Sequence, residues 1–474
     1  MPIGFGPPRM GTPEHRAVGA WLARCCLLVL CLLLVVPVPA SAKESRLSRP
    51  EARDLATALL RQDQPMVAHT LALGLLEADA RDYPALMILS RAESKLGRPD
   101  KSEIAARRAW RVADTPDEKF AAAYTLSQAL SGQERYGAAQ WWLRRARQAS
   151  DRPVLERAAK AQFARVRAAN PMTTRLTFSV KPSSNINGGP TSNTFTIGGV
   201  TFIDPSAVPL SGVEYSSSLT LRRDITPTAA QDAPKLHLGV SVDDRRYSLS
   251  SEARRSVPTA KASDYTFTEL EVFGGVVLPD TSGRAQSTID LTLGYNWYGH
   301  DPLAQYARLD LGRDWALNGG RLIGLGLSYE DQKRNDTSAR SSETLRFSGY
   351  WQTPVADKGK LTLGLSMAET SSESSAIAHD ALVASVNYAP DAEILGTQGR
   401  FSLAVVGRDY ERARYGSSPR SDHKVVAGAE FTFSNLEYMS FSPTLGLNYA
   451  RTRSNVSLFD SREFGLSVGF RSTF

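Results

Sequence analysis

Alternating apolar and polar residues mark the last segment of the chain. From Phe464 to Phe474, apolar side chains occupy every second position except Ser472, and the residues between them are small or polar. A two-residue period predicts a β-strand with one apolar and one polar face. A tilted strand of about ten residues is long enough to cross the hydrocarbon layer of a membrane. The apolar face of this segment consists of Phe464, Leu466, Val468, Phe470 and Phe474.

The same alternation recurs from Thr173 onward. In one example, Ile289, Leu291 and Leu293 alternate with Asp290 and Thr292. The second face of such segments carries Gly, Ser, Thr and Asn rather than Lys and Glu, which favours a barrel lumen over the solvated face of a soluble sandwich. We predict fourteen strands, at 173–181, 212–223, 234–247, 264–278, 286–298, 305–317, 321–332, 342–352, 360–371, 380–389, 399–410, 423–434, 440–451 and 464–474.

An even number of strands places both ends of a barrel on one side of the membrane. We therefore expect a closed, antiparallel transmembrane β-barrel over residues 171–474, with long loops at 182–211, 248–263 and 411–422 on the opposite side. The mean hydropathy of −0.27 is typical of a soluble protein. It does not exclude a barrel, because lipid-facing and lumen-facing residues cancel in such an average.

Residues 43–170 are instead rich in Ala, Leu and Arg at helical spacing. Two predicted helix pairs have turn glycines, Gly97 and Gly132, that lie 35 positions apart. Paired helices with this period are typical of tetratricopeptide repeats, and we expect about three repeats and a closing helix from Pro153 to Ala169. The predicted fold class is thus α + β and multidomain, with a short helical repeat domain before the barrel. Stacked repeats offer a concave surface for a peptide or another protein.

The first residues predict export. Arg16 and Arg24 precede a short apolar run, and Ala40-Ser41-Ala42 fits a signal-peptidase site, so residues 1–42 are predicted to be a signal peptide. The three cysteines of the chain, Cys25, Cys26 and Cys31, all lie within it. A mature chain without cysteine excludes a disulfide framework, a thiol nucleophile and a cysteine-ligated metal.

The chain carries a net charge of +7, and basic residues are dense between Arg135 and Arg167. One interpretation is a solvated helical face. The other is that these helices contact anionic lipid headgroups of the inner leaflet or an acidic client protein. The candidate contact residues are Arg144, Arg145 and Arg147.

Catalytic motifs are weak. The stretch from Gly465 to Gly469 matches Gly-x-Ser-x-Gly, but that chemistry needs its serine on a sharp strand-to-helix turn, whereas Ser467 lies within a predicted strand. No two histidines have the spacing of metal ligands. We find neither a phosphate-binding loop nor a base-stacking surface, so we expect no enzyme, no cofactor, no metal and no nucleic-acid partner.

The region after the first predicted strand resembles a known family. It contains Asn185-Ile186-Asn187, then Thr194-Phe-Thr-Ile-Gly-Gly, then Leu210-Ser-Gly212. This combination, with short repeats before it and a barrel ending in Phe after it, is similar to the Slam family of surface lipoprotein assembly modulators, the outer-membrane proteins of type XI secretion. The resemblance implies translocation of surface lipoproteins or secreted proteins, many of them concerned with iron or haem capture. Asn185 and Asn187 are positions of the family pattern, and an Asn side chain also suits a turn at the end of a strand.

The leading hypothesis is therefore a non-enzymatic outer-membrane translocator with a periplasmic helical domain. Its expected partners are outer-membrane lipid, a client protein and, during biogenesis, the barrel-insertion machinery, for which the apolar face ending at Phe474 would be part of the signal. Two alternatives stay open at this point. A polysaccharide exporter can also join such repeats to a barrel, although usually with a longer array, and a passive porin would have no need of the repeats.

Overall fold

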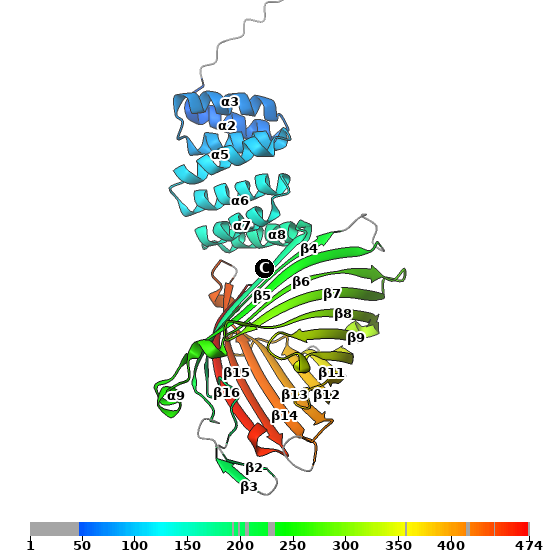
Figure 1. Cartoon of the computed structure of the whole chain (residues 1–474). Helices are drawn as coiled ribbons and strands as arrows, with labels where there is room; N and C mark the ends of the chain where they lie inside the picture. The colour runs from blue at the N-terminus through cyan, green and yellow to red at the C-terminus, as the bar shows by residue number, and fades with distance from the viewer. Residues whose placement is uncertain are drawn as a thin grey trace, which may run out of the picture.

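The computed structural model describes residues 47–191, 194–197, 200–203, 208–225, 233–355, 358–413, 418–439 and 441–472. The predicted signal peptide with its cysteines, and Phe474, lie outside these residues. The described chain forms a stack of helices followed by a closed barrel (Figure 1).

Seven helices form the stack within the described residues. They are α2 (Arg49–Arg61), α3 (Pro65–Ala78), α4 (Tyr83–Lys95), α5 (Pro99–Val112), α6 (Pro116–Gly132), α7 (Tyr136–Ala149) and α8 (Pro153–Ala169). Local sequence fixes where they start: Ser48 with Glu51, and Thr115 with Glu118, form capping boxes at α2 and α6. Gly97 adopts the left-handed backbone (φ +71°) that closes the turn after α4.

The helices pack in sequence as three pairs with α8 closing the stack. Two adjoining hydrophobic clusters hold them together, one around Leu86 in α4 and one around Leu126 and Leu143 in α6 and α7. All three leucines are fully buried. None of the described helices is long and apolar enough to span a membrane.

The barrel is a single antiparallel sheet in which each strand pairs with the next and the last pairs with the first. Its strands are β1 (Met172–Ser183), β4 (Gly212–Ile225), β5 (Lys235–Leu249), β6 (Phe267–Pro279), β7 (Ala285–Tyr298), β8 (Asp301–Leu317), β9 (Arg321–Arg334), β10 (Ser342–Pro354), β11 (Gly359–Ser372), β12 (His379–Pro390), β13 (Gln398–Tyr410), β14 (Ser421–Thr432), β15 (Phe441–Ser454) and β16 (Ser461–Ser472). Each of the fourteen predicted strands overlaps one of them, and the predicted fold class is confirmed.

A hairpin and a short α-helix are absent from the sequence-based prediction. The first long loop contains a two-stranded hairpin of β2 (Thr194–Ile197) and β3 (Val200–Ile203). The loop after β5 contains a short helix, α9 (Ser251–Ser256). Both project from the end of the barrel opposite the helical stack (Figure 1). We call that end the loop-side rim and the other end the helix-side rim.

The outer surface of the barrel is apolar. Large hydrophobic side chains at alternate positions of the strands are about 40–55% exposed, such as Leu291 and Leu293 in β7 and Leu365 in β11. An exposed apolar band around a closed barrel is typical of outer-membrane proteins.

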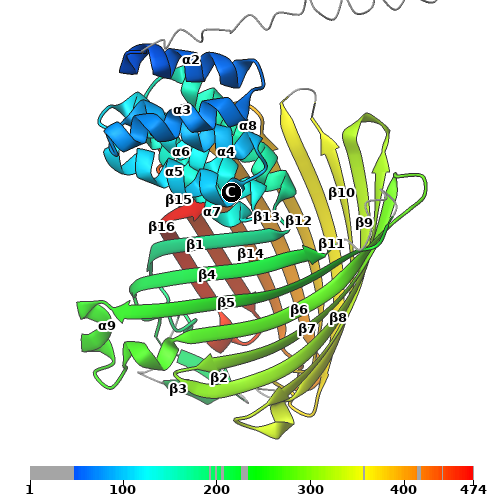
Figure 2. The ribbon, with the colours of Figure 1, turned by 90° about the horizontal axis from the view of Figure 1, so that it is seen from above.

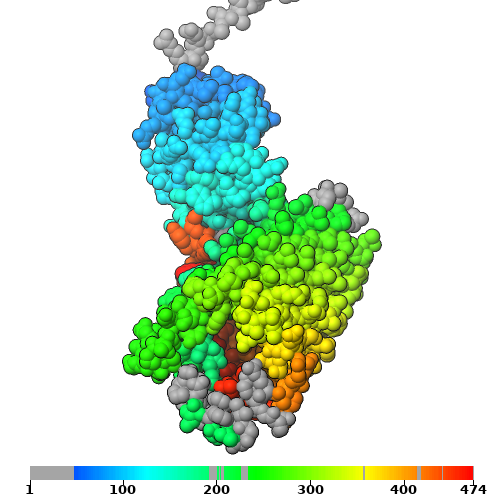
Figure 3. All heavy atoms as spheres, in the orientation of Figure 1, coloured from blue at the N-terminus to red at the C-terminus, as the bar shows by residue number. Residues whose placement is uncertain are grey.

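The helical stack stands over one side of the helix-side rim. Seen from above, it lies over β14, β15 and β16 (Figure 2). The space-filling view shows the turn between β14 and β15 directly beneath the last helices (Figure 3). The repeat domain therefore lies beside the mouth of the barrel, over the last three strands.

Candidate functional site

The lumen-facing side chains are mostly small or polar, as the alternation predicts. Glycines let larger lumen side chains lie flat on the wall: a Cβ atom at Gly294 would lie 2.1 Å from the Tyr306 ring, so a larger residue there would displace that ring. The Tyr306 hydroxyl donates a hydrogen bond to Glu271 Oε1 at 2.7 Å. The wall thus combines small residues with fixed polar groups.

Arg308 in β8 is the centre of a charged network on this wall. Its guanidinium lies 3.1 Å from Asp310, 3.3 Å from Glu271 in β6 and 3.5 Å from Glu330 in β9. The four side chains are about 20–40% exposed, so the network is fixed by neighbouring strands yet still accessible from the lumen. Such a charged surface suits contact with a polar solute or an unfolded polar segment.

The closure between β1 and β16 is less complete than the other strand pairs. β1 pairs with β4 without interruption from Met172 to Ser183, whereas its pairing with β16 runs from Thr177 to Val180 and resumes only at Ser183. Pro182 lies in the gap, and proline has no N–H group to donate to a ladder. The first and last strands are therefore held partly by side chains.

Lys181 supplies one such contact. Its Nζ atom lies 2.9 Å from Glu463 Oε1 in β16 and 3.5 Å from Glu214 Oε2 in β4. The ion pairs join three strands across the closure, next to the interruption in backbone pairing.

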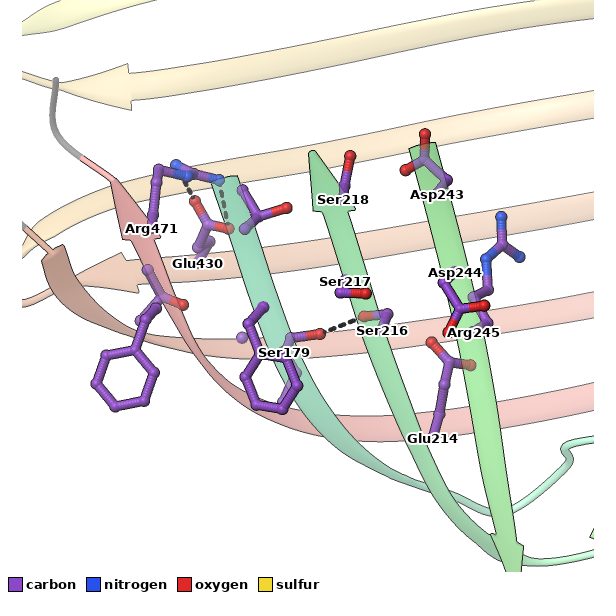
Figure 4. Close-up of a pocket in the computed structure, with 16 residues that line it drawn as sticks. Ser179, Glu214, Ser216, Ser217, Ser218, Asp243, Asp244, Arg245, Glu430 and Arg471 are labelled. Atoms are coloured by element: carbon purple, nitrogen blue, oxygen red, sulfur yellow. Dashed lines mark hydrogen bonds and ion pairs between the residues drawn. The ribbon is translucent and has the colours of Figure 1, made fainter. Parts of the chain in front are cut away.

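A cavity of about 370 Å³ lies on the lumen side of this seam (Figure 4). Hydroxyls and charged groups dominate its lining. Ser179 and Ser216 are hydrogen-bonded through their Oγ atoms at 2.7 Å, and Arg471 in β16 pairs with Glu430 in β14 at 2.7 Å. The labelled lining residues are Ser179, Glu214, Ser216, Ser217, Ser218, Asp243, Asp244, Arg245, Glu430 and Arg471.

The serine of the Gly-x-Ser-x-Gly match lines the same cavity. A Cβ atom at Gly446 would lie 2.3 Å from Ser467 Oγ, so this side chain lies against the neighbouring strand. Ser467 is within β16, and no histidine lines the cavity among the described residues. A serine within a strand does not lie on the sharp strand-to-helix turn that exposes the nucleophile of this motif.

Two of the described histidines each lie beside one carboxylate. His69 Nε2 lies 3.1 Å from Glu93, and His237 Nε2 lies 2.7 Å from Asp290. Among the residues that the structure describes, no group of three or more His, Cys, Asp or Glu side chains could hold a metal ion.

Asn185 and Asn187 lie in the first loop and bind its backbone. Asn185 is buried and exchanges two hydrogen bonds with the backbone of Gly189, both 2.8 Å. Asn187 donates to Val208 O and accepts from Leu210 N, each at 2.9 Å. The two side chains thus fix the start of the loop against its end, where Leu210 and Leu249 form a small hydrophobic cluster.

The apolar face of the last strand points away from the lumen. Phe464, Leu466, Val468 and Phe470 are 40–56% exposed on the outer surface of β16. This placement suits a lipid-facing strand. Recognition of this face by the insertion machinery stays a prediction.

Of the three candidate arginines of α7, Arg147 contacts the barrel, whereas Arg144 and Arg145 pack on aromatic rings within the stack. Arg147 Nη1 lies 2.7 Å from Glu437 Oε1 in the turn between β14 and β15. Arg144 lies over the Phe163 ring at 5.6 Å, and its burial lowers its pKa to about 10 while the charge of Glu437 opposes that shift. A cavity of about 260 Å³ adjoins Arg144, Arg147 and Glu437.

Arg145 lies within an aromatic cluster. Its guanidinium carbon is 4.9 Å from the Trp141 ring, 5.1 Å from Trp110 and 5.6 Å from Trp142. These distances are typical of cation–π contacts, which stabilise a partly exposed arginine. Contact of these three arginines with client or lipid stays a prediction.

Neither the comparison with protein-family models nor that with curated proteins finds a match to the chain. Separate solved structures resemble its helical region and its barrel. The helical half is similar to the Yersinia enterocolitica type III secretion translocator chaperone SycD, at 14% identity over 25% of this chain and 91% of that one, with a TM-score of 0.23.

The barrel half is similar to Acinetobacter baumannii OccAB3, at 9% identity over 63% of this chain and 98% of that one, with a TM-score of 0.35. It is also similar to Pseudomonas aeruginosa OccK2 (OpdF) in complex with glucuronate, at 12% identity over 64% and 98%, with a TM-score of 0.31. These identities and TM-scores describe a distant resemblance in fold.

Proposed function

We propose that this chain is an outer-membrane translocator that delivers client proteins to the cell surface. The clients would be surface lipoproteins or secreted proteins concerned with iron or haem capture, as the resemblance to the Slam family implies. In this proposal the helical stack is periplasmic, the loop-side rim faces the outside, and the chain performs no catalysis.

The observation that carries the proposal is the attachment of the repeat stack to the barrel mouth. Arg147 in α7 bonds to Glu437 in a barrel turn at 2.7 Å, with both side chains about four-fifths buried. Repeat stacks bind peptides and proteins on extended surfaces. A binding domain held beside the mouth would keep a client where the lumen begins, which a passive pore does not require.

The lumen supports the same proposal. A fourteen-stranded barrel is wider than the eight-stranded kind that its own side chains fill. Its small residues, hydroxyls and fixed ion pairs, such as those of Arg308, offer a hydrated wall for an extended polar segment.

The test is a comparison of surface and secreted proteins in a cell that carries the full chain, no chain, or a chain lacking residues 43–170 after its leader. We expect one or two specific proteins to disappear from the surface without the chain, with their precursors held in the periplasm. The truncated chain should still insert as a heat-modifiable barrel yet fail to restore export.

Three outcomes would contradict the proposal. Normal client exposure by the truncated barrel would remove the role of the repeats. An unchanged protein profile with loss of extracellular polysaccharide would favour a polysaccharide exporter. An unchanged profile together with steady single-channel conductance of the purified protein would favour a passive porin.

A further inference from the structure

Three arginines face outward at the loop-side end of the last two strands. Arg451 and Arg453 in β15 continue the outward series of Leu447 and Tyr449, and Arg462 in β16 precedes the outward Phe464 by two positions. All three arginines are exposed. Tyrosine at this level of a barrel is typical of the membrane interface, so the guanidinium groups lie at the height of lipid headgroups.

The sheet register brings these positive charges together. Arg451 is directly opposite Arg462, and Arg453 is directly opposite His423 in β14. Like charges opposite each other destabilise a sheet unless something compensates them. Arg462 lies over the Tyr449 ring at 5.9 Å, but none of the three arginines takes part in an ion pair within the described parts of the chain. Glu463 faces the lumen, where it pairs with Lys181.

An apolar groove of about 530 Å³ adjoins the cluster on the same outer face. Phe464 and Leu466 of β16 form one wall, and Pro182 and Val213 of β1 and β4 contribute to the other. Phe464 is 56% exposed although it lies in a hollow of the surface. The groove begins two residues along β16 from Arg462, so cationic and apolar surfaces meet at one place.

Another part of the loop-side rim carries the opposite charge. On β11, β12 and β13, Glu369, Asp380 and Asp409 lie directly opposite one another and face outward. These three carboxylates lie on strands away from the seam, whereas Arg451, Arg453 and Arg462 lie on the last two strands, beside the closure. Charge therefore favours an anionic amphiphile beside the last two strands over one at β11, β12 and β13.

We propose that Arg451, Arg453 and Arg462, with the groove beside Phe464, form a binding site for a phosphorylated lipid of the outer leaflet. The three guanidinium groups hold the phosphates, for which their planar, multidentate donors are suited, and an acyl chain lies in the groove. The assignment to the outer leaflet rests on the proposed orientation with periplasmic helices. A lipid at this position covers the incompletely paired seam between β1 and β16.

The test uses the purified full chain in a neutral detergent, titrated with bisphosphorylated lipid A and followed by native mass spectrometry. We expect a one-to-one adduct, and at least tenfold weaker binding of phosphate-free lipid A to the unchanged protein. The triple variant Arg451→Gln, Arg453→Gln, Arg462→Gln should weaken binding of bisphosphorylated lipid A at least tenfold.

The matched control is Arg223→Gln, Arg313→Gln, Arg321→Gln. It removes three arginines that also face outward, but at the helix-side rim, and should bind within twofold of the unchanged chain. Equal loss in the control, no loss in the first variant, or equal binding of phosphate-free lipid A would each overturn the proposal. The comparison of phosphate-free with bisphosphorylated lipid A uses the unchanged protein, so misfolding of a variant cannot affect its result. The binding measurement involves no client protein. The lipid-site proposal can therefore be refuted while the translocation proposal is supported, and the translocation proposal can be refuted while the lipid site is supported.

Discussion

Arg147 Nη1 lies 2.7 Å from Glu437 Oε1, and these two residues join the helical stack to a barrel turn 290 positions further along the chain. The side chains are 18% and 19% exposed. Removing one partner leaves the other charge largely buried with only a weaker second contact, Glu156 at 3.7 Å for Arg147 and the charge of Arg144 for Glu437, which costs more than the loss of an exposed pair. The contact therefore restrains how the repeats sit over the mouth of the barrel.

Charge reversal tests this restraint. We expect Arg147→Glu or Glu437→Arg alone to broaden the distance distribution between spin labels at Lys101→Cys in α5 and Asn318→Cys beside β9. The double reversal should narrow it again, with a coupling of about 1–2 kcal/mol. Double electron–electron resonance measures the distribution, and the predicted mature chain contains no cysteine of its own. A distribution that stays narrow in both single variants would exclude the restraint.

Much of the fold could be predicted because it depends on side-chain periodicity alone. In β7 and β16, apolar residues at every second position identify a strand, its lipid face and its lumen face without knowledge of its neighbours. Gly97 likewise marked the turn after α4, whereas Gly132 is the last residue of α6 and Glu134 adopts the left-handed backbone of the following turn. Antiparallel neighbours joined by short turns then determine most of the strand order.

The missed features depend on short segments or distant partners. β2 and β3 contain four residues each, too few for a periodic signal in a loop. The basic block around Arg144 showed charge but not burial, so its contact with Glu437 could not be predicted. The partners of Asn187 lie more than twenty positions away, at Val208 and Leu210, beyond the reach of a local turn pattern.

Packing within the stack gives a prediction for stability. Leu126 is fully buried in the second hydrophobic cluster, so Leu126→Ala should lower the free energy of unfolding of the helical domain by about 2–5 kcal/mol. Thermal melts of the full chain, followed by the helical far-UV signal, measure the loss. The control Leu73→Ala changes a leucine that is 42% exposed and should cost much less. Similar losses in the two variants would contradict the assigned core.

Low pH should weaken the contact between α6 and the start of α8. Hydrogen bonds from Arg152 and Ser150 lower the pKa of Asp117 in the folded chain. A carboxyl group with a lowered pKa stabilises the fold above its unfolded pKa of about 3.9, and this contribution is lost as pH falls through the folded value. We expect the helical melting temperature to fall below about pH 4. Asp117→Asn and Arg152→Gln should each flatten that dependence, and an unchanged pH profile in both would exclude the pair as a cause.

Lys181 gives a prediction for the closure of the barrel. Its ion pairs with Glu463 and Glu214 bridge β16, β1 and β4 where backbone pairing is interrupted. Lys181→Met leaves two carboxylates near each other without their cation, and we expect a loss of about 1–3 kcal/mol. The midpoint of heat modification on a gel should fall by several degrees. Lys424→Met, which removes a lysine from β14 away from the seam, should change it less.

A cross-link can then show whether that loss arises at the seam. Val180 and Val468 are directly opposite each other on β1 and β16, so cysteines at these two positions lie close enough to form a disulfide. Oxidation should restore the midpoint of the Lys181→Met variant, because a covalent link replaces the lost ion pairs as the contact between the strands. If the oxidised protein stays as unstable as the reduced one, the effect of Lys181 arises elsewhere in the lumen, and the closure does not depend on it.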